Sequence, residues 1–107
     1  MGKITGLFGI PVGSSNEKGE VYNIFGIKVG SIDDEGQVYN FLNIKVGNVD
    51  DDGTINSILG IKMGSVQKDG TIKSMIGIDA GKADPKDGVK NIGAGALLLI
   101  LTNAGGK

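Results

Sequence analysis

The chain contains no cysteine, no histidine and no tryptophan among its 107 residues. Without cysteine or histidine it has no thiol nucleophile, no serine–histidine–aspartate relay, no zinc site of the usual kind and no disulfide framework. Its formal net charge is −1, so the overall charge gives no indication of binding to nucleic acid or to anionic lipid. The composition argues against an enzyme, and we expect no cofactor and no bound metal.

Aromatic residues make up 5% of the chain and proline occurs twice, whereas glycine occurs 20 times. The core therefore has to consist mainly of isoleucine, valine, leucine and methionine. The longest apolar run, residues 96–101, is much shorter than the about 20 residues of a membrane-spanning helix, so we expect no transmembrane segment. No export signal follows Met1, which leaves a cytoplasmic protein and an exported one with its signal removed as alternatives.

The excess of glycine belongs to a repeat with a period of 17 residues. The repeat divides residues 2–86 without a gap into five units, and residues 87–107 follow as a closing segment of the same domain. The units are residues 2–18, 19–35, 36–52, 53–69 and 70–86. Three columns of identical residues define them: Gly2, Gly19, Gly36, Gly53 and Gly70; Ile10, Ile27, Ile44, Ile61 and Ile78; and Gly13, Gly30, Gly47, Gly64 and Gly81.

Each unit has the length and the pattern of a β-hairpin. Seventeen residues suit two strands of about five residues and two turns. β-Branched residues alternate with polar ones, as in Ile-Lys-Val-Gly-Ser-Ile at residues 27–32, and helical spacing is absent from the repeats. The Gly13 column falls inside a strand, where glycine indicates a bulge, a bend or the close approach of another backbone. We expect the five units to converge on a common axis.

Both turns of a unit depend on glycine. One is a polar, often acidic cluster that ends in glycine, such as Asp33-Asp34-Glu35-Gly36, which predicts a type I turn closed by a left-handed glycine. In the other turn, asparagine replaces glycine once, and asparagine tolerates positive φ best after glycine. We therefore expect positive φ in both columns. The predicted structural turn residues are Gly19, Gly36, Gly53 and Gly70 in the first, and Gly26, Asn43, Gly60 and Gly77 in the second.

The units that begin at Gly19 and Gly36 fit the form G-x-V-Y-N-x-x-G-I-K-V-G-x-V-D-D-D most closely. A repeat of this form resembles the five-fold β-flower proteins, small bacterial proteins of hairpin repeats around a pseudo-five-fold axis, although MORN-type and RHS-type repeats share its glycine and aromatic character. The resemblance covers residues 2–86 and implies a fold but no activity and no catalytic residues. The implied fold is all-β: five hairpins in a closed, propeller- or barrel-like ring, with the apolar C-terminal segment packed at its centre or end.

Some residues depart from the repeat pattern. Pro11 and Asp79 replace lysine, and Ala80 and Ala83 replace larger apolar residues. We therefore expect the first and last units to be less regular, as in capping repeats.

The repeat register breaks after Lys86, and residues 94–101 are apolar throughout. Five consecutive large aliphatic residues cannot all lie on one face of a strand or helix. We interpret residues 88–101 as a plug at the centre of the ring or as a strand buried on both faces. The alternatives are a self-association surface and a site for an apolar ligand, formed by Leu97, Leu98, Leu99, Ile100 and Leu101.

The acidic turns invite a calcium interpretation, because clustered carboxylate oxygens suit that ion. Lysine, however, occurs in the equivalent turns of three of the five units, which is wrong for a repeated metal loop. Solvated turn residues are the better interpretation, and only residues 50–52 keep a continuous carboxylate cluster for weak cation binding.

Two further sets of residues suggest ligand sites. Lys28, Lys45 and Lys62 occupy equivalent positions on one side of the predicted ring and could face an anion, but lysine alternating with isoleucine and valine is typical of a solvent-exposed face. Tyr22 and Tyr39, each followed by asparagine, could form a sugar-binding patch, but glycan-binding repeats need more aromatic residues, so packing is favoured.

These observations predict a non-enzymatic structural or interaction module, acting as a homo-oligomer or on an unknown protein partner. The second hypothesis is binding of a lipid or other apolar small ligand at the ring axis. An enzyme is the weakest hypothesis, because paired carboxylates occur only in turns, where water keeps them unsuited to general acid catalysis.

Overall fold

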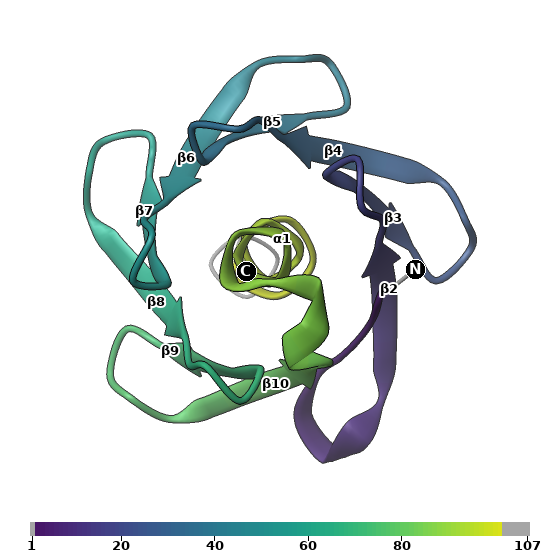
Figure 1. The fold of residues 1–107 in the computed structure, drawn as a ribbon, viewed down its shortest axis with the longest axis vertical. Helices are drawn as coiled ribbons and strands as arrows, with labels where there is room; N and C mark the ends of the chain where they lie inside the picture. The colour runs from purple at the N-terminus through teal and green to yellow at the C-terminus, as the bar shows by residue number, and fades with distance from the viewer. Residues whose placement is uncertain (1, 102–107) are drawn as a thin grey trace.

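Ten antiparallel strands form one closed barrel in the computed structural model, which describes residues 2–101 (Figure 1). Strands that are consecutive in sequence pair with each other, and the pairing of the first strand with the last closes the barrel. The predicted all-β fold of five hairpins in a closed ring is thereby confirmed.

The strands are short and follow the repeat. The first strands of the hairpins are β1 Gly2–Thr5, β3 Glu20–Asn23, β5 Gln37–Asn40, β7 Thr54–Ser57 and β9 Thr71–Ser74. Their partners are β2 Pro11–Ser15, β4 Lys28–Ile32, β6 Lys45–Val49, β8 Lys62–Val66 and β10 Asp79–Ala83. The remaining elements are the 3-10 turns η1 Leu7–Gly9 and η2 Pro85–Asp87, the helix α1 Val89–Ala96, and the π-helical turn η3 Leu97–Leu101 that continues it.

Two sets of turns connect the strands, and they lie at opposite ends of the strands because successive strands run in opposite directions. We call the first set the acidic turns: residues 16–19, 33–36, 50–53 and 67–70. The second set, within each hairpin, we call the tips: residues 7–10, 24–27, 41–44, 58–61 and 75–78. In Figure 1 the tips project outward from the ring like petals, whereas the acidic turns stay close to it.

Both turns have the geometry that the sequence predicts. The N–H of Gly36 donates to the Asp33 carbonyl at 3.0 Å, and Gly36 has φ of +86°. The Asp33 carboxylate also accepts the N–H groups of Glu35 and Gln37, at 3.0 and 2.9 Å. At the corresponding tip Asn43 has φ of +66°, in the left-handed region that asparagine tolerates.

The first hairpin is irregular at its tip. Gly6 stands where other units have asparagine or serine, so no side chain caps this turn, and both Phe8 and Gly9 have positive φ (+62° and +73°). The last hairpin pairs with the same register as the others. The expected irregularity is therefore present in the first unit, whereas the strand pairing of the last unit is regular.

The helix runs along the barrel axis, surrounded by the inward-facing residues of all ten strands (Figure 1). Each first strand contributes one fully buried aliphatic side chain, and each second strand contributes a glycine and one further buried residue. The buried side chains are Ile4, Val21, Val38, Ile55 and Ile72 from the first strands, and Ser15, Ile32, Val49, Val66 and Ala83 from the second. The interpretation of the C-terminal segment as a central plug is correct, and the plug is a helix rather than a buried strand.

Each glycine of the Gly13 column faces one residue of η3. A Cβ atom built at Gly13 would lie 2.6 Å from Leu99 Cδ1, and one at Gly47 would lie 2.9 Å from Leu97 Cδ2. The same Cβ atoms would overlap carbonyl oxygens of the adjacent strand, so glycine serves both the close strand approach and the helix. The full set of pairs is Leu97 with Gly47, Leu98 with Gly30, Leu99 with Gly13, Ile100 with Gly81, and Leu101 with Gly64.

These pairs follow the ring in order. Each step along η3 moves to the neighbouring hairpin in the same direction, so five residues go once around the barrel. An α-helix turns once every 3.6 residues, which steps too far for one side chain to meet each of five hairpins. The wider π-helical turn brings the step closer to one fifth of a circle. The five consecutive aliphatic residues therefore point in all directions because the wall surrounds them.

Helix α1 shows the reverse arrangement of size. Its buried residues are mostly small, and they lie where the wall carries large side chains: a Cβ at Gly93 would be 2.7 Å from Val49 Cγ1, and one at Gly95 would overlap Ile4 Cδ1. Large wall residues thus face small helix residues, and wall glycines face large helix residues. This alternation packs the helix against the wall along its length.

We predict that Leu97→Ala lowers the free energy of unfolding by about 2–5 kcal/mol, because Leu97 is 2% exposed and its removal leaves a cavity against Gly47. Leu59→Ala is the matched control, since Leu59 is 81% exposed, and we expect it to change stability by less than about 0.5 kcal/mol. Urea unfolding measures both. Equal effects in the two variants would contradict the packing of η3.

We also predict that Gly53→Ala destabilises the protein more than Gly60→Ala, by at least about 1 kcal/mol. Both glycines have positive φ (+92° and +81°), so both substitutions cause backbone strain. A Cβ at Gly53 would in addition overlap the Val66 carbonyl oxygen, whereas a Cβ at Gly60 meets open space. Thermal and urea unfolding of the two variants provide the comparison, and a larger loss for Gly60→Ala would exclude this assignment.

Candidate functional site

Each tip presents three large apolar side chains to solvent. All fifteen are at least 55% exposed, and Phe8 reaches 94%. We call this set the tip ring. Its members are Leu7, Phe8 and Ile10; Ile24, Phe25 and Ile27; Phe41, Leu42 and Ile44; Ile58, Leu59 and Ile61; and Met75, Ile76 and Ile78.

The turn geometry forces these side chains outward. The two central residues of a β-turn point away from both strands, and at the tips the strands have already left the barrel wall (Figure 1). Such positions are normally polar. In the sequence, Ile10 and its equivalents define the repeat, and their exposure was not predicted. The signal was present: two apolar residues at the centre of each predicted turn, directly before the glycine or Asn43.

The tip ring is a set of five separate apolar clusters rather than one patch. The five hairpins pair in equivalent registers and the barrel is closed, so a rotation about the axis relates them, and the equivalent tips lie at the same level along the axis and at the same distance from it. The molecule measures 30 × 29 × 29 Å, so the tips are distributed around a circle on the scale of the whole protein. The centre of this circle is the end of the barrel.

Charge is distributed unequally between the two ends of the strands. Ten of the 12 carboxylates lie in the acidic turns or in the η2 segment after β10: Glu17, Asp33, Asp34, Glu35, Asp50, Asp51, Asp52, Asp69, Asp84 and Asp87. Lys28, Lys45 and Lys62 directly follow three adjacent tips and are exposed. Asp79 is the acidic residue at the equivalent position of the last hairpin, and it is paired with Lys73.

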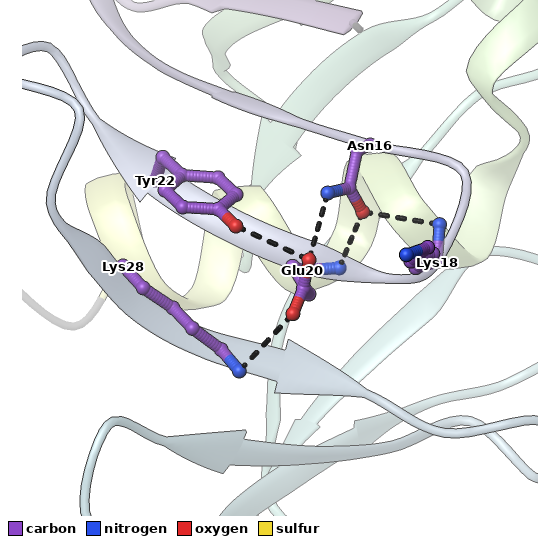
Figure 2. A network of polar contacts seen from close by, with 5 residues as sticks. All are labelled: Asn16, Lys18, Glu20, Tyr22 and Lys28. Atoms are coloured by element: carbon purple, nitrogen blue, oxygen red, sulfur yellow. Dashed lines mark hydrogen bonds and ion pairs between the residues drawn. The ribbon is translucent and has the colours of Figure 1, made fainter.

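The outer wall of the second hairpin carries a network of polar side chains centred on Glu20 (Figure 2). Its carboxylate accepts hydrogen bonds from Asn16 at 2.9 Å and from the Tyr22 hydroxyl at 3.1 Å, and it forms an ion pair with Lys28 at 3.4 Å. The hydrogen bond from Asn16, followed by those from Tyr22 and Lys28, lowers the pKa of Glu20. The hydrogen bond to Glu20 raises the pKa of the Tyr22 hydroxyl. Glu20 therefore stays ionised and is unsuited to act as a general acid.

The residues of the hypothetical sugar patch have structural contacts. The Tyr39 hydroxyl donates to Asp33 and Gln37 at 3.4 Å, as Tyr22 does to Glu20. The side-chain oxygens of Asn23 and Asn40 cap the tips that follow them. The three lysines predicted on one side of the ring are all exposed. Of these three, Lys28 alone forms an ion pair within residues 2–101.

Leu97, Leu99 and Leu101 are buried in the barrel, and Leu98 and Ile100 are half-buried against the same core. The chain's own helix takes the axial position where the second hypothesis places an apolar ligand. We therefore take the tip ring, rather than the barrel axis, as the candidate site.

A polar cavity of about 380 Å³ lies at the end of the barrel opposite the tips, between the first acidic turn and the start of the helix. Asp87, Asn16 and Asn91 are among its lining residues. The Oδ2 atom of Asp87 is buried and has no hydrogen-bond partner within residues 2–101. Over the same residues, no three acidic side chains come together in a way that would hold a metal ion.

No protein-family model, curated protein or solved structure matches this chain. Within the described part of the chain, no helix combines the length and the apolar character that crossing a membrane requires. The assignment of the tip ring as the candidate site therefore rests on its exposed side chains, their repetition in five hairpins and the charges around them.

We predict that Asp87→Asn becomes more stable relative to the parent protein as the pH rises from 3 to 7. Burial, followed by the charge of Asp84, raises the pKa of Asp87, so the folded state retains a proton that the unfolded state has released. In the parent, the contribution of Asp87 to stability falls as the pH rises through that window, whereas asparagine mimics the protonated form at every pH. Urea unfolding at pH 3, 5 and 7 measures the difference. A variant that loses stability relative to the parent over this range would contradict the burial of an unpaired carboxyl.

Proposed function

We propose that this protein is a non-enzymatic interaction module that binds its partner through the tip ring. The observation that carries the proposal is the exposure of fifteen large apolar side chains at equivalent positions of five hairpins. Each tip gathers three exposed large apolar side chains, and clustered exposed apolar surface is typical of binding sites. Covering it releases free energy in proportion to the apolar area removed from water.

The fold does not need apolar residues at the tips. The turn depends on a residue of positive φ near its end, and the side chains that cap its start are polar: Asn23 and Gly26 have these roles in the second hairpin, and Asn40 and Asn43 in the third. The side chains between them contribute nothing to the core, where Ile4 and its equivalents lie. Their apolar character in every unit is therefore explained better by binding than by folding.

The chemistry of the side chains supports a binding role over catalysis. The chain lacks cysteine and histidine, and the most connected carboxylate, Glu20, is held ionised by its neighbours. We further propose that the chain is one of the five-fold β-flower proteins, and the closed ring of five hairpins around an apolar axial segment supports this assignment.

A variant of the tip ring tests this proposal. It carries one polar substitution per tip: Phe8→Asn, Phe25→Ser, Leu42→Ser, Leu59→Ser and Ile76→Ser. We expect the free energy of unfolding to change by less than about 0.5 kcal/mol per site, because these side chains lie outside the core. We also expect the variant to lose retention on a phenyl column and binding of a hydrophobic dye.

The matched control carries five serine substitutions at exposed residues of the acidic turns, Glu17, Lys18, Asp34, Glu35 and Lys68. It should be retained like the parent. Retention that is equal in the parent and in the tip-ring variant would reject the ring as the binding surface.

A further inference from the structure

We propose that the tip ring inserts into the surface of an anionic lipid bilayer and that the acidic turns face away from it. This inference rests on the proposed function, because it names the partner of the same surface.

The arrangement of the tips fits a fluid, planar partner. The five tips lie at one level around the axis, so all of them reach a plane together. A protein interface typically has a continuous apolar centre with a polar rim. Here the order is reversed, because the apolar side chains lie at the periphery and the barrel end lies at the centre (Figure 1). A bilayer accepts five separate apolar insertions, since lipids rearrange around each of them.

The composition of the tips suits the interfacial region of a membrane. None of the twenty tip residues is charged, and their large side chains are phenylalanine, leucine, isoleucine and methionine. Short apolar elements of this kind bury their side chains about 5–10 Å into the boundary between headgroups and acyl chains.

In three of the five hairpins, three backbone N–H groups of the tip are satisfied within the turn. Asn23 alone accepts the N–H groups of Phe25, Gly26 and Ile27, at 2.9, 3.0 and 3.1 Å. Asn40 accepts the equivalent three groups in the third hairpin, and Ser57 in the fourth. In water this would matter little, because solvent satisfies exposed amides. In the lipid interface it lowers the cost of transferring the backbone donors of these three tips out of water.

The charges orient the ring towards anionic lipid. Lys28, Lys45 and Lys62 directly follow three adjacent tips, where ammonium groups meet lipid phosphates when the tips are inserted, although Lys28 must first leave its ion pair with Glu20. Ten of the 12 carboxylates lie at the opposite end of the strands or in the segment after β10. An anionic surface therefore attracts the end that carries the tips and repels the other end.

The experiment uses tryptophan as a local probe, because the chain contains none. Phe25→Trp places the probe in a tip, and Lys68→Trp places the control in an acidic turn. Vesicles contain phosphatidylcholine alone or phosphatidylcholine with 30% phosphatidylserine. We expect the Phe25→Trp emission to shift to the blue on the anionic vesicles and to be quenched by brominated acyl chains, while Lys68→Trp stays unchanged.

Charge variants test the orientation. Substituting Lys28, Lys45 and Lys62 together with glutamine should abolish the preference for anionic vesicles, measured by co-sedimentation. The control with Lys18, Lys68 and Lys86 changed to glutamine has the same net charge but should keep the preference. The tip-ring variant should lose at least tenfold in partitioning to either vesicle. Equal losses in the two lysine variants would overturn the proposed orientation.

The outcomes separate this inference from the proposed function. A parent protein that ignores both kinds of vesicle but still differs from the tip-ring variant on the phenyl column overturns the lipid partner and leaves the interaction surface in place. A blue shift of Phe25→Trp that depends on protein concentration without lipid assigns the ring to a second copy of the chain and overturns the lipid proposal. Equal retention of the parent and the tip-ring variant on the column rejects both.

Discussion

The fit of five consecutive aliphatic side chains to five glycines is the constraint on which the rest of this structure depends. Each residue from Leu97 to Leu101 needs space in a different direction, and each hairpin provides it by omitting a side chain at one inward position. The number of hairpins, the π-helical turn and the glycine column are therefore linked. A sixth hairpin or a regular α-helix would break the correspondence between helix residues and wall glycines.

Because the helix and the inner wall complete the core, the side chains at the tips of the hairpins are not needed to form it. The tips extend beyond the wall, and their capping groups, such as Asn23, hold the turn shape without help from the apolar residues between. This separation lets the same short repeat serve two purposes. Its inward positions build a closed barrel, and its tip repeats one apolar cluster five times at a single level.

The sequence predicted much of the fold because the repeat copies each local rule five times. The turns at Gly36 and Asn43 follow from local turn chemistry, and the closed ring follows from five equal hairpins. The helical plug was predicted only as a buried segment, because the run at residues 97–101 is apolar at every position and therefore has no amphipathic pattern that would distinguish a helix from a strand. The tip ring was missed because the turn at Gly26 and its equivalents was predicted from the glycine and asparagine column alone, without asking whether the apolar residues before it, such as Phe25, would be exposed. Its charge environment was not visible in the net charge of −1, because that number adds the lysines near the tips to the carboxylates at the opposite end of the strands.

The sequence by itself determined the repeat, the hairpins, the positive-φ positions and the absence of thiol and imidazole chemistry. These are local properties, set by the spacing of glycines and by the residue types at each turn. Only the tertiary structure decided that Leu97 and its neighbours face inward while Phe25 and its equivalents face outward. Both groups are runs of apolar residues, and burial depends on what surrounds them. The axial segment is enclosed by ten strands, whereas the tips project outward from the barrel and no other element covers them within residues 2–101.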